Sequence, residues 1–315
     1  MARQFLAVMA LGALLGGCSE LSAVQSRPAE DAGLPLPRRE VLPNGMSLII
    51  QEHRAADIVA LYLFVGVGAR DEAPNQLGFS HFQEHMLFKG TDTWGPGFVD
   101  RAVEGVGGAS NANTTLDYTF FSFLLPAEEA ANGIRILADM AFRSKFDPTE
   151  LNREREVIFE ERRIETDNPR IALVRGVYGL VFRDHPYGHS LLGMRETLKA
   201  GTPERVRAYY NRHYTPENMA LVVVGPVVPQ RARAVVQRTF GQVPATSYKR
   251  APLPAPRPVK GKIRREVERP EQQAYLALGW SAPPTDAADS FAVDLVVSIL
   301  GGTESSRLAR TLRDR

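Results

Sequence analysis

The sequence predicts an α+β fold arranged as two domains, of which the second is incomplete. Three observations support this prediction: the length of 315 residues, the composition, and the order of the periodic segments. At roughly 100–200 residues per domain, the length suggests two domains. With 44% apolar and 23% charged residues, the chain has the proportions of a soluble globular protein. Strands come first, then helices, then a closing strand, which is an order typical of α+β proteins.

The first domain begins with strands that are followed by two short helices. Residues Glu40–His53 predict a hairpin, because apolar positions flank Pro43-Asn44-Gly45 and Asn-Gly is a strong turn signal. The nearly continuous apolar run Ile58–Val67 predicts a strand that is buried on both faces. Helical patterns at Leu77–Lys89 and Phe98–Val106 each end at glycine.

Further strands and helices complete this domain, to which we assign residues 39–245. Asn113–Leu125 alternates as strands do and stops at Pro126, and Asn218–Val224 is a second strand, rich in β-branched residues. Thr202-Pro203 predicts a helix start, because a capping residue is followed by proline at the first helical position. The helices expected here are Ala127–Arg143, Pro148–Thr166, Arg170–Phe182, Thr202–Tyr214 and Val228–Phe240.

A proline-rich linker at residues 246–265 separates the first domain from a second unit at residues 266–315. This second unit is expected to contain a strand at Gln273–Trp280, a helix at Ala287–Leu300 and the start of another helix at Ser305. About 50 residues cannot bury an independent core of useful size. Either this second unit packs on the first domain, or the sequence is a fragment of a longer chain. We favour the fragment, in which the second α+β domain is only partly present.

Residues 1–17 predict a lipoprotein signal peptide. Arg3 supplies a positive charge, and the apolar run Phe5–Gly17 is too short to span a bilayer but suits a signal-peptide core. Cys18, the only cysteine, follows Leu15-Gly16-Gly17, which resembles a bacterial lipobox. We expect lipidation at Cys18 and a tether over residues 18–38; the alternatives are an ordinary signal peptide or a buried helix. Ser19 favours the outer membrane, with the protein facing the periplasm.

Charge and cysteine content exclude several classes of protein. The formal net charge is +2 and no run of five basic residues occurs, so no nucleic-acid partner is expected. One cysteine excludes both a disulfide framework and a cysteine-based zinc site. Any metal bound by this chain must therefore be held by histidines and carboxylates.

The segment His81-Phe82-Gln83-Glu84-His85 predicts a metal site on a helix. Two histidines four residues apart lie on one helix face, so both imidazoles reach a single ion. Glu84 projects close to the same face and is the candidate general base, because zinc lowers the pKa of a bound water to about 7. The order His-x-x-Glu-His is the inverzincin signature.

The third protein ligand must come from another segment, because a catalytic zinc takes three protein ligands and keeps one position open. At about 100° per residue, Glu154 and Glu161 share one helix face to within about 20°. This geometry selects the pair but leaves open which of the two binds the metal. The candidates in this charged stretch are Glu154, Glu156, Glu160, Glu161 and Glu165.

The segment Gly78–Thr91, Gly-Phe-Ser-His-Phe-Gln-Glu-His-Met-Leu-Phe-Lys-Gly-Thr, resembles the pitrilysin/insulinase family of zinc peptidases, which includes the mitochondrial processing peptidase. The resemblance covers about residues 39–315. It implies two related mixed α/β sandwich domains, the second incomplete here, and one zinc ion per chain. His81, His85 and Glu161 would be the ligands, with 75 residues between the last two. Glu154 matches an acid that orients a ligand or the active-site water.

The resemblance extends to the segment Gly107–Thr114, which is similar to the family's active-site edge strand. A peptide substrate adds to that strand as an extra strand, held by main-chain hydrogen bonds. This implies substrate binding by Asn111, Ala112 and Asn113. In the family, the second domain contributes an Arg and a Tyr to substrate binding from positions that this sequence does not contain.

These expectations together predict a zinc endopeptidase acting on peptides or unfolded segments, with Glu84 as general base and then proton donor. The alternative is a non-catalytic or partner-dependent peptide-binding subunit, in a homodimer or in a heterodimer with a related subunit. Hydrolysis of a non-peptide substrate is a third interpretation. The intact motif favours catalysis. Among the histidines outside the motif, His185 and His189 are expected to be structural, and His53 and His213 to be structural or exposed.

Overall fold

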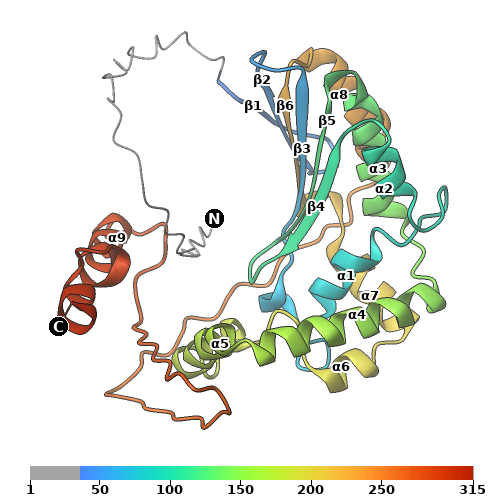
Figure 1. The fold of residues 1–315 in the computed structure, drawn as a ribbon. Helices are drawn as coiled ribbons and strands as arrows, with labels where there is room; N and C mark the ends of the chain where they lie inside the picture. The colour runs from blue at the N-terminus through green and yellow to red at the C-terminus, as the bar shows by residue number, and fades with distance from the viewer. Residues whose placement is uncertain (1–35, 315) are drawn as a thin grey trace, which may run out of the picture. The chain divides into compact units, whose positions relative to one another are not determined.

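The computed structural model describes residues 36–314, so the predicted signal peptide, Cys18 and most of the predicted tether lie outside the described residues. The chain divides into the compact unit Gly33–Gly279 and a second unit that includes Trp280–Arg315. The larger unit has the predicted α+β architecture: one sheet with helices on one of its faces and at one of its ends (Figure 1).

Within the described chain, six strands form one mixed sheet in the order β1-β2-β6-β3-β5-β4. The last of them in the sequence, β6, lies between β2 and β3, parallel to β2 and antiparallel to β3. Strand β4 forms one edge of the sheet (Figure 1). The strands are β1 (Arg38–Val41), β2 (Ser47–Glu52), β3 (Ile58–Val65), β4 (Ala109–Thr114), β5 (Thr119–Pro126) and β6 (Met219–Gly225).

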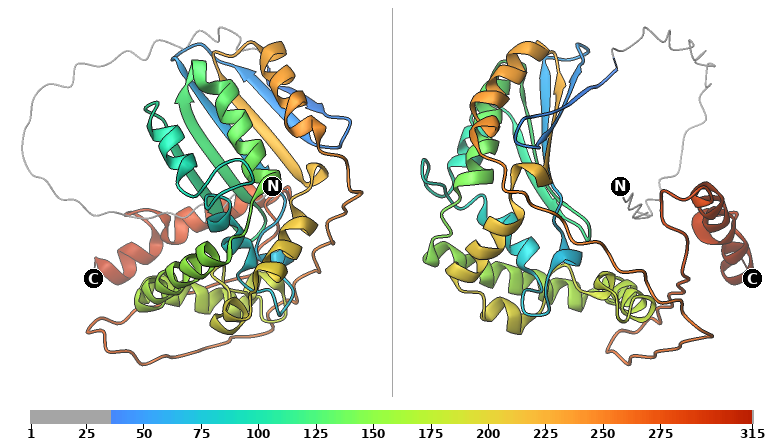
Figure 2. Two further views of the ribbon diagram at one scale, coloured as in Figure 1. Left: turned by 90° about the vertical axis from the view of Figure 1, so that its right-hand side faces the viewer. Right: turned by 180° about the vertical axis from the view of Figure 1, so that it is seen from behind.

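Helices α2 (Phe98–Glu104), α3 (Ala130–Arg143) and α8 (Pro229–Arg238) cover one face of the sheet (Figure 2). Beneath them, Leu61 and Leu63 of β3 are fully buried in the core. On the other face of the same strand, Ile58 is 47% and Tyr62 38% exposed. The prediction that the run Ile58–Val67 is buried on both faces is therefore wrong. Among the described elements, helices cover only one side of this strand.

The other helices of this unit lie at one end of the sheet, where α1 packs against α4 and α7 (Figure 1). Asp147 begins α4 by accepting hydrogen bonds from the N–H groups of Thr149 and Glu150. Asn168 ends α4 and caps α5 in the same way. These helices are α1 (Phe79–Met86), α4 (Pro148–Asp167), α5 (Pro169–Val181), α6 (Arg195–Lys199) and α7 (Pro203–His213). Short helical turns are η1 (Ala69–Asp71), η2 (Ala127–Glu129), η3 (Pro186–Gly188), η4 (Pro216–Asn218) and η5 (Phe240–Gln242).

Two local predictions are confirmed and one is wrong. β1 and β2 form the predicted hairpin around Asn44-Gly45, and Thr202 caps α7 by accepting a hydrogen bond from the N–H of Arg205. The segment Gln273–Trp280, predicted as a strand, belongs to no strand. A strand needs a neighbour to pair its N–H and C=O groups, and no described strand pairs with it.

The unit that includes Trp280–Arg315 has helical elements between Ser290 and Arg313, in the region where the sequence predicts helices. Its elements are α9 (Ser290–Val297), η6 (Ser298–Gly302) and η7 (Ala309–Arg313). In residues 36–314, no helix is both long enough and apolar enough to cross a membrane.

Candidate active site

Helix α1 presents the two motif histidines on one face. Its other face buries Phe79, Phe82 and Met86 in the hydrophobic core. The ring centroids of His81 and His85 lie 4.6 Å apart. The spacing of four residues therefore brings the two imidazoles together, as helical geometry predicts.

Glu161 of α4 joins the two histidines. Its Oε2 lies 3.6 Å from Nε2 of His81 and 3.7 Å from Nε2 of His85. One potential ligand atom from each of the three residues lies within 4.8 Å of the other two. The neighbouring Glu160 is exposed and pairs instead with Arg163. Among the candidate acids on this helix, Glu161 is the one that faces both Nε2 atoms.

Glu154, also on α4, contacts the other ring nitrogen of His85. Its Oε2 lies 2.9 Å from Nδ1 of His85, and its Oε1 lies 2.9 Å from Nζ of Lys89. Burial alone would raise the pKa of Glu154, but the contacts with His85 and Lys89 outweigh it and the pKa is lowered. An ionised carboxylate only accepts hydrogen bonds, so Nδ1 of His85 is the donor, and Nε2 is the ring nitrogen that faces Glu161.

This group of residues fits a zinc ion. Two imidazole nitrogens and one carboxylate oxygen form a ligand set found in catalytic zinc sites. Burial lowers the pKa of His81 to about 3, with smaller contributions from His85 and Arg175. The imidazole of His81 is therefore neutral, which is the form that binds metals. Its buried Nδ1 has no hydrogen-bond partner among the described residues.

Glu84 lies beside the three potential ligands. Its Oε2 accepts a hydrogen bond from Oγ1 of Thr114 at 2.6 Å. Burial raises the pKa of Glu84, while the contacts with Thr114 and His85 act in the opposite direction. A carboxyl group with a raised pKa and a fixed orientation suits proton transfer near neutral pH.

Thr114 is the last residue of the edge strand β4 and connects that strand to Glu84. Asn111 and Asn113 are exposed, whereas Ala112 packs against the core. Oδ1 of Asn111 accepts a hydrogen bond from the N–H of Ala112 at 2.9 Å. The structure therefore places the three predicted substrate-binding residues on a sheet edge that ends at Glu84.

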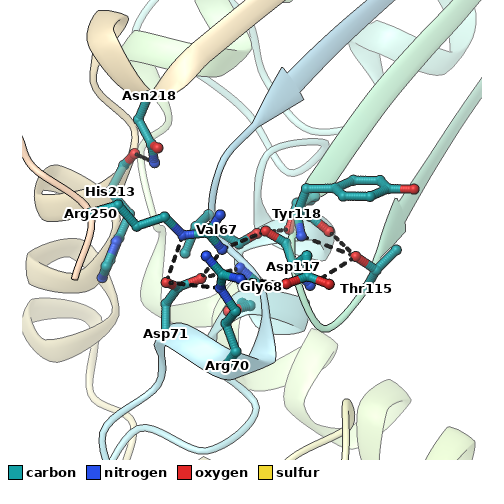
Figure 3. Close-up of polar contacts among 12 residues, drawn as sticks. Val67, Gly68, Arg70, Asp71, Thr115, Asp117, Tyr118, His213, Asn218 and Arg250 are labelled. Atoms are coloured by element: carbon teal, nitrogen blue, oxygen red, sulfur yellow. Dashed lines mark hydrogen bonds and ion pairs between the residues drawn. The ribbon is translucent and has the colours of Figure 1, made fainter. Parts of the chain in front are cut away.

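A polar network holds the turn that follows β4 (Figure 3). Arg250, from the proline-rich linker, contacts the carboxylate of Asp71 at 2.9 and 2.6 Å. It also donates to the backbone carbonyl of Asp117 at 2.5 Å. Arg70 and Tyr187 each donate to Oδ1 of Asp117 at 2.7 Å. The linker has no helix or strand of its own here, yet it is attached beside the end of the edge strand.

Two contacts at the site were not predicted from the sequence, that of Lys89 with Glu154 and that of Thr114 with Glu84. Lys89 follows His85 by four positions, so helical spacing was a signal for its place beside Glu154. Thr114 reaches Glu84 from a different element, and no local pattern indicates that contact. His185 has a structural environment, as predicted: it is buried, and its two ring nitrogens contact backbone groups.

The α+β domain carries the motif His-x-x-Glu-His at the end of its sheet. This combination of fold and motif is typical of metallopeptidases. Residues 48–195 match the insulinase family (peptidase family M16), and residues 201–315 match a domain described as the peptidase M16 inactive domain. The zinc protease YmxG of Bacillus subtilis is 32% identical over 283 residues, which cover 88% of this chain and 67% of that protein. This chain belongs to the insulinase family of peptidases, so the family resemblance is confirmed.

Further relatives and solved structures are similar. A zinc protease of Mycobacterium tuberculosis strain H37Rv is 30% identical over 292 residues, covering 91% of this chain and 66% of the relative. The periplasmic protease PqqL from Escherichia coli matches with a TM-score of 0.66 and 27% identity, over 70% of this chain and 25% of that one. A protease from Helicobacter pylori shares the fold (TM-score 0.74, 24% identity, 89% of this chain and 69% of that one). This chain spans about two thirds of the length of the relatives named zinc proteases.

Proposed function

We propose that this chain is the catalytic part of a zinc-dependent endopeptidase that cleaves peptides or unfolded polypeptide segments. The observation that carries the proposal is the convergence of His81, His85 and Glu161 within 4.8 Å, with Glu84 held beside them. Family membership and the relatives named zinc proteases support a proteolytic function.

His81, His85 and Glu161 would hold one zinc ion per chain, and Glu154 would keep Nε2 of His85 turned toward it. The chemistry that zinc supplies when bound is that of a Lewis acid, which polarises a carbonyl oxygen and lowers the pKa of water. The hydrogen bond from His85 to Glu154 determines which ring nitrogen is free, as partners of metal-binding histidines commonly do.

Glu84 carries the proton in this proposal. Its carboxylate takes a proton from the water that attacks the scissile carbonyl carbon, and it later gives a proton to the leaving amine nitrogen. Water is thereby added across the broken C–N bond. The hydroxyl of Thr114 holds Oε2 of Glu84, which leaves Oε1 for the transfers.

The substrate would add to β4 as a further strand. Main-chain pairing accounts for recognition of extended segments with loose sequence preference. The N–H of Ala112, which now donates to the side chain of Asn111, would then donate to a carbonyl of the substrate. Because β4 ends at Thr114, and Thr114 contacts Glu84, this binding mode brings the peptide to the general base.

The test is hydrolysis of a quenched fluorescent peptide by a soluble chain without Cys18, compared with its Glu84→Gln variant. Zinc content is measured in both proteins. We expect chelator-sensitive cleavage in the parent chain and its loss in the variant, with zinc retained. Cleavage that persists in Glu84→Gln would contradict the assignment of the base.

The alternative function is a peptide-binding subunit that needs a catalytic partner, such as a second related chain. The match of residues 201–315 to a domain described as inactive is the observation that supports this alternative. Absence of cleavage by a zinc-loaded parent chain, together with binding of the same peptide, would favour it over catalysis.

We further propose that the protein is located in the bacterial cell envelope, anchored by lipid at Cys18 and facing the periplasm. The signal-peptide pattern of residues 1–17 supports this location, as does the similarity to a protease described as periplasmic. The variant Cys18→Ser should leave the membrane fraction. If it stays membrane-associated, the lipid anchor is not what holds the protein there.

A further inference from the structure

The helix that carries the histidines lacks a cap of its own. Helix α1 has only eight residues, and isolated helices of this length are marginal in water. Gly78 at its N-terminus has a φ of +95° and offers no side chain to the first-turn N–H groups. A Cβ at this position would lie 2.9 Å from Cα of Gly193, so no larger residue fits without a shift. The first-turn N–H groups therefore need an acceptor from another segment.

Glu72 supplies that acceptor from six residues upstream. Its Oε2 accepts a hydrogen bond from the N–H of Gly78, and its Oε1 accepts one from the N–H of Ser80, both at 2.7 Å. The side chain lies in the interior, with the residue only 5% exposed. Burial raises the pKa of Glu72 to about 8, and the two N–H groups act in the opposite direction. The N–H groups therefore offset part of the cost of burying this carboxyl group.

The same end of α1 is connected to α4, which carries Glu161. Arg162, the next residue on α4, donates a hydrogen bond to the carbonyl of Gly193. Gly193 in turn lies directly against Gly78, because a Cβ placed on either glycine would lie 2.9 Å or less from the Cα of the other. The separation between the histidines of α1 and Glu161 therefore depends on where the first turn of α1 is held.

We propose that Glu72 is a positioning residue of the metal site. Its two carboxyl oxygens hold the first turn of α1, and with it His81 and His85, in the arrangement that binds zinc. The effect passes through the backbone of the helix, because Glu72 contacts Gly78 and Ser80 rather than either histidine. This inference rests on the proposed zinc-peptidase function.

The test compares the 315-residue chain with its Glu72→Gln variant. Glutamine keeps the shape of the side chain and is neutral, so it costs less to bury than an ionised glutamate. It has only one acceptor oxygen, however, and its NH₂ group would face one of the two N–H groups of Gly78 and Ser80. We therefore expect the thermal unfolding midpoint to change little. Zinc affinity, measured by competition with a chromophoric chelator, should fall about tenfold. Hydrogen exchange at the amide of Ser80 should be faster in the metal-free variant.

Ser80→Ala is the matched control at the same end of the helix. It removes the hydroxyl of Ser80, which contacts the hydroxyl of Tyr209 at 2.7 Å and also interacts with Glu72, but it keeps the N–H that donates to Glu72. This control should retain zinc affinity and amide protection. Unchanged zinc affinity in Glu72→Gln would overturn the inference, as would an equal loss in Ser80→Ala. If the unsubstituted chain binds no zinc, the proposed function fails as well, so the two failures are distinguishable.

Discussion

Replacing Glu154 by glutamine changes the charge behind the metal site while keeping the shape of the side chain. Glu154 contacts Nδ1 of His85 and Nζ of Lys89, both at 2.9 Å. Glutamine has one oxygen, and because the side chain of Lys89 is 31% exposed and reaches water, we expect that oxygen to face His85. The hydrogen bond to His85 then no longer involves a charged acceptor. A hydrogen bond to a charged group contributes about 1.5–3 kcal/mol, and roughly half of this is lost when the acceptor is neutral. A loss of about 1.4 kcal/mol corresponds to tenfold weaker zinc binding.

Glu154→Leu is the more severe variant, because it leaves the Nδ1–H of His85 without an acceptor, and about a hundredfold weaker zinc binding is expected. The assay is competition for zinc with a chromophoric chelator. Glu160→Gln is the control on the same helix, since that side chain is exposed and pairs with Arg163. Zinc affinity of Glu154→Gln equal to that of the control would refute the orienting role. Complete loss of zinc in Glu154→Gln would instead make Glu154 a ligand.

Three further predictions concern the ligand set, the base and the pH dependence of stability. Glu161→Gln should lose zinc while Glu160→Gln keeps it, and the reverse zinc contents would shift the ligand by one residue. Thr114→Val should lower kcat about tenfold at unchanged KM, because Glu84 loses its hydrogen bond. Thr114→Ser keeps the hydroxyl and should have the kcat of the unsubstituted chain. Equal kcat in all three proteins would contradict this prediction. Burial lowers the pKa of His213 to about 4, against 6.5 when unfolded. As the pH falls, the unfolded state therefore takes up a proton at His213 before the folded state does. The contribution of His213 to the free energy of unfolding is complete above pH 6.5 and decreases by about 2 kcal/mol by pH 5. The free energy of unfolding of His213→Asn, measured with urea, should decrease less between pH 6.5 and pH 5 than that of the unsubstituted chain. An equal decrease in both proteins would contradict this prediction.

Local periodicity predicted most of the helices and strands but not their arrangement. The hairpin of β1 and β2 and the cap of α7 follow from neighbouring residues, so the sequence alone was sufficient. The place of β6 between β2 and β3 depends on pairing between distant segments, as in Val65 with Met219. The errors at Ile58–Val67 and Gln273–Trp280 have the same origin. Burial of a face and pairing of an edge depend on which other elements are present, which a local pattern does not encode.

At the site, the sequence by itself determined that His81 and His85 share one face of a short helix, because a spacing of four residues is one helical turn. Helical geometry also narrowed the candidates for a third ligand to Glu154 and Glu161. The family resemblance favoured Glu161, but helical geometry did not separate the two. The tertiary structure gives them different positions, because the packing of α1 against α4 puts Glu161 opposite both Nε2 atoms and Glu154 against Nδ1 of His85.

The contacts of Thr114 with Glu84 and of Glu72 with the start of α1 were likewise decided by the tertiary structure. Each joins α1 to a residue outside the helix. A periodic pattern describes one helix or strand at a time, so it contains no information about which elements meet. The fold of the sheet and the packing of α1 at its end supply that information.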